Sequence, residues 1–232
     1  MSEKRIVIMG HAVDFSLIYY SIHNTYYREH ADFILLNKMS EISVTELEIC
    51  ERVDLIFAFN NSYAEAKLLY KSLGREINKK CICLLEKVEN EKDYDGAFTD
   101  KIIQWIYPKD TKTAILEMIM KMLCGKSYII KTDFSQILKM SVNAPELKSE
   151  IMVYKGKLEE VVHESEYCVK RIANKKCKLL SITGDLTLID VSNLYEIFRK
   201  ESKPELIVSY KAEEEYGVLA MWQHNPGDIN EE

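Results

Sequence analysis

Short, almost wholly apolar runs alternate with mixed polar and apolar stretches through the first half of this 232-residue sequence. Such runs are typical of strands buried on both faces of a parallel sheet, and the stretches between them have helical length. The alternation predicts right-handed crossovers and a doubly wound, Rossmann-like sheet. The predicted strands are Arg5–Met9, Ala31–Leu36, Val53–Phe59, Cys81–Leu85 and Lys101–Tyr107, and the predicted helices are Val13–His23, Val44–Arg52 and Tyr63–Leu73.

The second half of the sequence predicts helices packed against a smaller sheet. Apolar residues at spacings of three and four from about Thr111 to Leu123 predict a helix, which Gly125 ends. The other predicted strands are Glu150–Tyr154, Lys178–Ile182, Leu206–Tyr210 and Val218–Trp222, the last one paired through a turn around 213–217, and the predicted helices are Leu158–Ala173 and Leu188–Lys200. The predicted fold class is α/β: a Rossmann-like parallel-sheet domain (1–110), a central linking helix (111–125), a smaller α+β domain (126–225) and a short tail (226–232).

Composition and charge narrow the class of protein. Hydrophobic residues make up 47% and charged residues 29% of the sequence, which is typical of a globular protein. The net charge is −6 and no basic stripe is evident, so nucleic acid is not an expected partner. No apolar run approaches the roughly 20 residues that a membrane span requires. A strand-like run begins almost at once and leaves no room for a signal peptide, so the sequence predicts a cytoplasmic protein.

Metal binding is not expected. The six cysteines form no Cys-x-x-Cys pair and show no spacing typical of zinc ligands, so reduced thiols buried in the core are predicted. Alternation places Cys81 and Cys83 on the same face of their strand. His163 and Glu164 have no second histidine at ligand spacing, which favours a solvated helix face.

The loops that follow the predicted strands are poor in the residues that bind phosphate. A nucleotide beyond the carboxyl ends of parallel strands needs close backbone N–H groups, which glycines supply because they lack a Cβ. The loop after the first strand has Gly10 alone, followed by bulky residues and the carboxylate of Asp14. The loop after the third strand begins Asn60-Asn61-Ser62 and has no glycine, although Ser62 is a good helix cap. These loops favour loss of nucleotide binding, and no cofactor is expected.

The segment from Lys176 to Trp222 carries a resemblance to a known family. The turn Ser181-Ile182-Thr183-Gly184-Asp185 and the helix start Leu186-Thr187-Leu188-Ile189-Asp190-Val191 resemble the C-terminal domain of FtsZ, the bacterial tubulin homologue. The resemblance covers most of residues 5–222 and is strongest from about residue 126 onward. It implies the FtsZ/tubulin-like fold, in which subunits stack head to tail and bind GTP between them.

Two departures from that family bear on activity. The run Val53–Phe59 resembles the strand that leads into the FtsZ Gly-Gly-Gly-Thr-Gly-[Ser/Thr]-Gly loop, but the loop itself is absent. The segment 126–138 resembles the catalytic loop Asn-x-Asp-Phe-x-Asp, in which carboxylates position the attacking water. Asp133 and Phe134 match that loop, whereas Lys131 stands at the Asn position and Gln136 at the second Asp position. The resemblance therefore implies no catalytic residues here and makes Lys131, Asp133, Phe134 and Gln136 candidate interface residues.

Three hypotheses about function follow. The first is a non-catalytic FtsZ/tubulin-like protein, a pseudo-GTPase, that acts through contact with itself or with a cytoskeletal or cell-division partner. The second is a divergent GTP-binding switch or GTPase with Gly10, Asn60, Asn61 and Ser62 as its phosphate site and Asp133 as its catalytic acid. The third is a sensor of an uncharged small molecule, with Phe15, Phe59 and Tyr63 near its pocket. The missing glycines favour the first.

Overall fold

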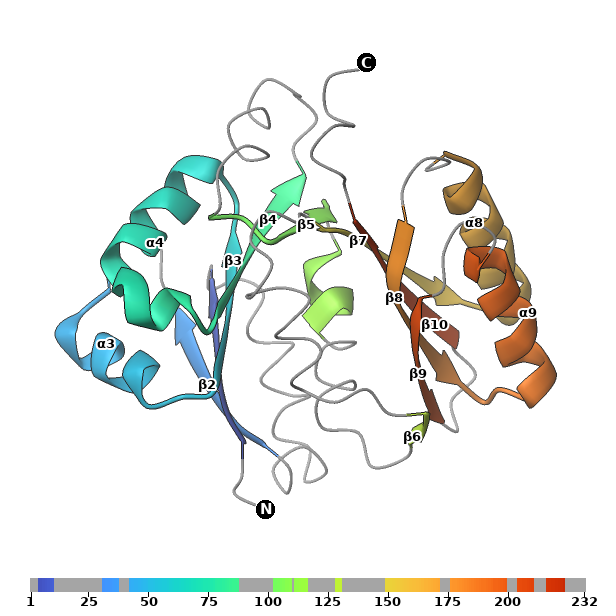
Figure 1. Cartoon of the computed structure of the whole chain (residues 1–232), viewed down its shortest axis with the longest axis horizontal. Coiled ribbons are helices and arrows are strands. Elements are labelled where there is room, and N and C mark those ends of the chain that lie inside the picture. The colour runs from blue at the N-terminus through green and yellow to red at the C-terminus, as the bar shows by residue number, and fades with distance from the viewer. Residues whose placement is uncertain are drawn as a thin grey trace. The chain divides into compact units, whose positions relative to one another are not determined.

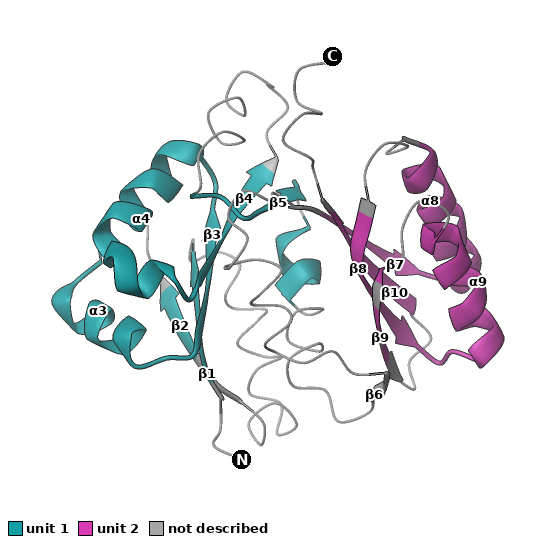
Figure 2. Ribbon diagram, in the orientation of Figure 1, with its two compact units in different colours: residues 1–117, 138–148 teal, residues 118–137, 149–232 magenta. Residues whose placement is uncertain are grey.

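The chain forms two compact units (Figure 2). Unit 1 contains residues 1–117 and 138–148, and unit 2 contains residues 118–137 and 149–232. The computed structural model describes residues 4–10, 31–37, 42–87, 102–109, 111–116, 128–130, 149–171, 176–199, 204–210 and 216–223. The predicted helix Val13–His23 and the tail 226–232 lie outside these ranges. Residues 112–116 are helical. The proposed central helix over 111–125, and with it the domain boundaries, remains a prediction because residues 117–127 are not described.

Unit 1 contains a five-stranded sheet in which all neighbouring strands are parallel (Figure 1). The strand order β2-β1-β3-β4-β5 is that of a doubly wound sheet. Two described helices, α3 and α4, cover one face. The elements are β1 (Lys4–Gly10), β2 (Ala31–Asn37), α3 (Val44–Glu51), β3 (Leu55–Asn60), α4 (Tyr63–Asn78), β4 (Cys81–Lys87) and β5 (Trp105–Pro108). The predicted Rossmann-like parallel sheet is confirmed.

Burial on both faces explains why the apolar runs form strands. All six residues of β3 are buried, with exposed fractions between 0% and 3%. One face of the sheet packs under α3 and α4, where Ile56, Ala58 and Cys81 meet Leu73 and Ile77 of α4. A parallel strand in this position has no solvated face, so it cannot alternate apolar and polar residues.

The fifth strand begins later than predicted. It was expected from Lys101, but β5 begins at Trp105. The residue before it, Gln104, bonds twice to Cys83: its backbone N–H donates to the Cys83 carbonyl (3.0 Å), and its side-chain Oε1 accepts from the Cys83 N–H (2.7 Å). Because the Gln104 side chain takes the place of a backbone acceptor in this contact, the regular β4–β5 ladder starts only at the next residue, Trp105. Ile102 and Ile103 are buried without being in a strand.

Helix α4 contains a break at Gly74. The prediction ended this helix at Leu73, whereas it continues to Asn78 after Gly74 adopts φ 73° and ψ 170°. This conformation is almost confined to glycine. The side-chain amide of Asn78 donates to the Tyr70 carbonyl at 2.7 Å, which provides a partner for a carbonyl near the break.

Unit 2 contains a mixed sheet with strand order β7-β10-β8-β9-β6. Strand β10 pairs antiparallel with β7 and β8, β8 pairs parallel with β9, and β9 pairs antiparallel with β6. Two helices, α8 and α9, cover one face (Figure 1). The elements are β6 (Tyr128–Ile130), β7 (Ser149–Gly156), α8 (Leu158–Arg171), β8 (Lys176–Gly184), α9 (Leu188–Arg199), β9 (Glu205–Tyr210) and β10 (Tyr216–Gln223).

The expected hairpin between the last two strands is wrong. Although they are consecutive in the sequence, β10 lies between β7 and β8 and does not pair with β9. In the centre of the sheet β10 has a ladder on each side and places Val218, Ala220 and Trp222 in the core under α8 and α9. The ring of Trp222 lies 5.7 Å from that of Phe198 of α9.

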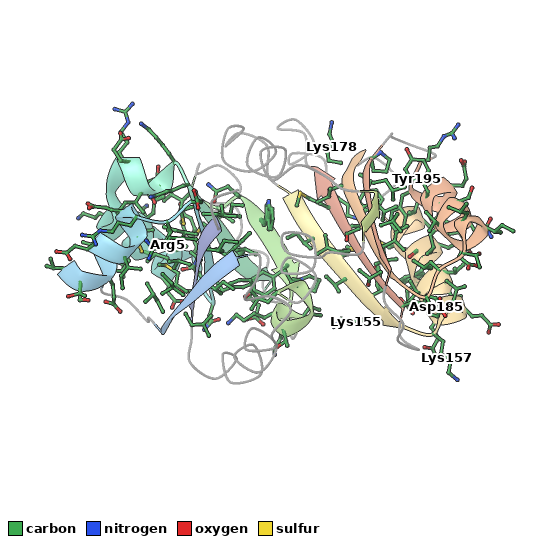
Figure 3. All side chains as sticks on the ribbon, turned by 90° about the horizontal axis from the view of Figure 1, so that it is seen from below. Arg5, Lys155, Lys157, Lys178, Asp185 and Tyr195 are labelled. Carbon is green, nitrogen blue, oxygen red and sulfur yellow. The ribbon has the colours of Figure 1, made fainter. Side chains whose placement is uncertain are left out.

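An irregularity in β8 changes which side chains face the core. The register between β8 and β10 shifts so that Leu179 pairs with Met221 while Cys177 pairs with Trp222, which leaves Lys178 without a partner in the ladder. Cys177 therefore shares the core-facing side with Leu180 and Ile182, which strict alternation does not allow. The exposed Lys178 and Asp185, labelled in Figure 3, lie near the two ends of this strand.

Gly184 ends β8 at a position that a larger residue cannot occupy without strain. Its φ is 145°, and a Cβ there would meet Tyr216 at 2.6 Å from Cδ1 of the ring and 3.3 Å from the Cα. We expect Gly184→Ala to lower the free energy of unfolding by roughly 1–3 kcal/mol from backbone strain alone. Urea-induced unfolding followed by circular dichroism measures this loss. The matched control is Asp185→Ala at the next, exposed position, which should change stability by at most about 0.5 kcal/mol. Equal stability of the two variants would contradict the prediction.

Candidate functional site

The carboxyl edge of the unit 1 sheet brings two of the sequence-predicted site positions together. Gly10 ends β1 and Asn60 ends β3, and these neighbouring strands are parallel, with Met9 opposite Ala58. The turn from Asn60 to the start of α4 therefore lies beside the end of β1. This edge is where ligands bind in open parallel sheets, so it is the candidate site in the described residues.

The side chain of Asn60 is buried in the sheet, where it bonds to the backbone of β3 and β4, and is not exposed at the edge. Its side chain is 1% exposed, and its amide nitrogen lies within hydrogen-bonding distance of the Ala58 carbonyl (3.0 Å), the Leu84 carbonyl (3.1 Å) and Cys83 Sγ (3.1 Å). These contacts tie the end of β3 to β4. The Oδ1 atom is buried without a hydrogen-bond partner. An amide held in this way is not available as a donor to a phosphate, so Asn60 could take part in a phosphate site only through its backbone.

The rest of the turn is closed by its own side chains. The Asn61 backbone N–H donates to Glu65 Oε2 at 2.9 Å, and the Glu65 backbone N–H donates to Ser62 Oγ at 3.2 Å. Ser62 is thus the N-cap of α4, as predicted, with extended backbone angles of −146° and 156°. The carboxylate of Glu65 places a negative charge at the start of the helix, where the helix dipole stabilises it.

An aromatic cluster on the other face of the same sheet was not predicted. The rings of Phe59 and Tyr107 are 5.6 Å apart, and Lys112 Nζ lies 5.9 Å from the Phe59 ring centre. Phe57 and Trp105 form a second pair at 6.0 Å. Lys112 is only 9% exposed. The signal in the sequence was the period-two spacing of aromatic residues in β3 and β5, but only the strand order shows that they meet. Phe59 is 3% exposed, so it serves the core, and Phe15 lies outside the described residues.

The cysteines behave as core residues. Cys50, Cys81, Cys83, Cys168 and Cys177 are buried thiols that are not joined in disulfides. Burial raises the pKa of the Cys50 thiol to about 11 and that of Cys177 to about 12, so both remain protonated and weakly nucleophilic near neutral pH. Burial also lowers the pKa of Lys80, whose ammonium group donates to the carbonyls of Glu51 (2.6 Å) and Val53 (2.8 Å).

Metal-binding and membrane-spanning features are not found in the part of the chain that the structure describes. There, no group of three or more His, Cys, Asp and Glu side chains is arranged to hold a metal ion. His163 and Glu164 are exposed, 79% and 52% by side chain, with 4.0 Å between Nδ1 and Oε1. None of the helices described is long and apolar enough to cross a bilayer.

Among the described residues of unit 2, the most exposed large apolar side chains lie at the start of α9. Leu188 is 75% exposed and Ile189 is 71% exposed, directly after Thr187. The Thr187 hydroxyl and backbone N–H both donate to Asp190 Oδ2, at 2.6 and 2.9 Å, so this helix start is well capped.

Three charged residues of unit 2, Lys155, Lys157 and Asp185, lie at the same end of its sheet (Figure 3), because β7 and β8 run in the same direction. Their mixed charges single out neither an anion nor a cation site. The interface candidates Lys131, Asp133, Phe134 and Gln136 lie outside the described residues.

Comparison with solved structures identifies the fold. The chain is similar to CetZ from Methanosaeta thermophila strain DSM 6194, with a TM-score of 0.56 and 10% sequence identity over 96% of this chain and 87% of that one. It is also similar to TubZ from Bacillus thuringiensis serovar israelensis, whose crystal structure is of GDP-form protofilaments, with a TM-score of 0.53 and 9% identity over 97% and 86% of the two chains. The chain therefore has the FtsZ/tubulin-like fold. Its sequence matches no protein-family model and no curated protein.

Replacing Asn60 with aspartate tests how the turn is held. We expect Asn60→Asp to destabilise the protein by roughly 3–5 kcal/mol at neutral pH, because a buried carboxylate would face the Ala58 and Leu84 carbonyls. These contacts should raise the folded-state pKa above the unfolded value of about 3.9. The cost should therefore be smallest below about pH 4 and should grow as pH rises through the folded pKa. Urea unfolding at acidic and neutral pH measures it, with exposed Asn61→Asp as the control. A cost independent of pH would contradict the prediction.

Proposed function

We propose that this chain is a non-catalytic FtsZ/tubulin-like protein that acts through protein–protein contact and has lost GTP binding and hydrolysis. The observation that carries the proposal is the closed turn between β3 and α4. Its Asn61 N–H is bonded to Glu65, its Glu65 N–H is bonded to Ser62, and the amide of Asn60 is buried between β3 and β4. Contact with itself or with an FtsZ/tubulin-like filament is the proposed mode of action, in a cytoskeletal or cell-division role in the cytoplasm.

Electrostatics at this turn supports the loss of phosphate binding. A phosphate that approached within about 4 Å of the Glu65 carboxylate would be repelled by about 4 kcal/mol per pair of unit charges, at an effective dielectric constant of about 20. This corresponds to roughly a thousandfold loss of affinity. A glycine-rich loop offers free N–H groups instead. In this turn the N–H groups of Asn61 and Glu65 already have internal partners.

Two observations support action through protein contact. The TubZ structure with a similar fold is one of protofilaments, so this fold can serve assembly in at least one protein. In the present chain Leu188 and Ile189 expose consecutive apolar side chains on a capped helix start. Exposed apolar side chains that lie together can contribute to a contact surface.

Calorimetric titration of Mg-GTP tests the proposal directly. We expect no saturable heat with Mg-GTP, as with the Mg-ATP and Mg-GDP controls, because the Asn61 and Glu65 N–H groups are occupied and Glu65 repels phosphate. Micromolar binding selective for guanine would overturn this part of the proposal. It would favour the divergent GTPase with Gly10, Asn60, Asn61 and Ser62 as its phosphate site, in which case Asn61→Asp should abolish binding.

The segment that resembles the catalytic loop provides a test of head-to-tail contact. We expect Asp133→Arg to weaken self-association, or binding to an FtsZ/tubulin-like filament, by about tenfold or more, because a reversed charge in an interface opposes its former partners. Sedimentation velocity measures the self-association, and co-pelleting measures filament binding. Glu48→Arg makes the same charge change at an exposed position of α3 and is the control. Unchanged association of the Asp133 variant would exclude the stacking contact.

A further inference from the structure

Helix α4 presents a basic surface with one exposed apolar side chain among its cations. Its buried face is formed by Ala66, Leu73 and Ile77. On the opposite side Leu68 is 53% exposed. Three cations lie near it on exposed positions of the helix. We call this surface the α4 patch; it consists of Lys67, Leu68, Lys71 and Arg75.

The two acidic groups of α4 lie near its ends. Glu65 is bonded to the Asn61 N–H at the helix start. Glu76 accepts from Lys79 at 2.7 and 2.8 Å near the helix end; this contact, and to a smaller extent the charge of Arg75, lowers the pKa of the Glu76 carboxyl. The positive charges of Lys67 and Lys71 therefore dominate the exposed middle of α4, although the whole protein is acidic, with a net charge of −6.

Helix α8 presents the complementary arrangement. Val161, Ser165 and Cys168 are its buried residues, and the opposite side exposes Tyr167 (53%) among carboxylates. A stripe with spacings of three and four runs along this side. We call it the α8 patch; it consists of Glu160, His163, Glu164 and Tyr167, with the exposed Glu159 and Glu166 beside it and Lys170 beyond its end.

We propose that the α4 patch of one copy of this chain packs against the α8 patch of a second copy. Each patch combines an exposed apolar side chain, Leu68 in one and Tyr167 in the other, with charges. The charges of the two patches are opposite in sign, so the two surfaces are electrostatically complementary. A second copy is the occupant because both complementary surfaces occur on the same chain. In Figure 2, α4 lies on one face of the unit 1 sheet and α8 on one face of the unit 2 sheet. The inference rests on the proposed action through protein contact and names its surface.

The geometry of such a contact sets the form of the assembly. Because the two patches differ, the contact is heterologous and each bound copy still offers one free patch. Copies can then add one after another into an open chain unless the rotation between them closes a ring. Because the charges are exposed, the association should weaken as salt rises, and should be largely lost near 1 M salt, where the Debye length is about 3 Å.

A charge-swap experiment tests the pairing. Lys71→Glu and Glu164→Lys should each lower the association constant by about tenfold or more in sedimentation velocity at low salt. An equimolar mixture of the two variants should recover association, because each contact in an alternating chain again joins opposite charges. The double variant, with both changes in one chain, should also recover it. Circular dichroism confirms that each variant is folded. Arg52→Glu and Asp185→Lys reverse exposed charges outside both patches and should leave association unchanged.

The outcomes separate this inference from the proposed function. If the wild type associates and neither single variant weakens it, the α4–α8 contact is wrong, while action through another surface stands. If both variants weaken association but their mixture does not recover it, the patches do not face each other and the inference is overturned. A wild type that stays monomeric at low salt also overturns it, and the Mg-GTP titration then still decides independently whether nucleotide binding is lost.

Discussion

Burial of β3 on both faces is the constraint on which unit 1 depends. The strand lies between β1 and β4, and its large apolar side chains each contribute roughly 1.5–3 kcal/mol by leaving water. A strand in this position must satisfy every polar group at its end from within the protein, because water cannot reach it. The Asn60 amide nitrogen does so by donating to carbonyls of β3 and β4, whereas its Oδ1 atom is left without a partner. The position of the following turn, and of the start of α4, is a consequence of that contact.

The carboxyl edge of this sheet shows how side chains close in sequence can hold the backbone of a turn. The parallel strands, the turn after β3 and the helix start are all present. There the carboxylate of Glu65 in α4 accepts from the Asn61 N–H, and the hydroxyl of Ser62, the N-cap of α4, accepts from the Glu65 N–H. Local side chains can thus fill the role that an external anion has at a helix start.

Local features were predictable from the sequence, and long-range ones were not. Continuous apolar runs predicted β1 to β4 within one to two residues at most ends, and Ser62 was predicted as a cap because capping depends on three or four consecutive residues. The pairing of β10 was missed because strand order depends on contacts between residues far apart in sequence. The irregular register at Lys178 and the contact of Gln104 with Cys83 were missed for the same reason. At the candidate site, residue identity predicted where the turn lies, but not that Asn60 points into the sheet.

The position of β10 has a consequence for how the protein is made. The sheet of unit 2 is completed by its last described strand, residues 216–223, which lies between β7 and β8. During synthesis, β7 and β8 emerge from the ribosome well before the strand that joins them, and each exposes an unpaired edge until then. Unit 1 has no such delay among its described strands, because they all precede residue 109. Unit 2 should therefore be the part that depends on chaperones and is prone to aggregate when translation is slow or interrupted near its end.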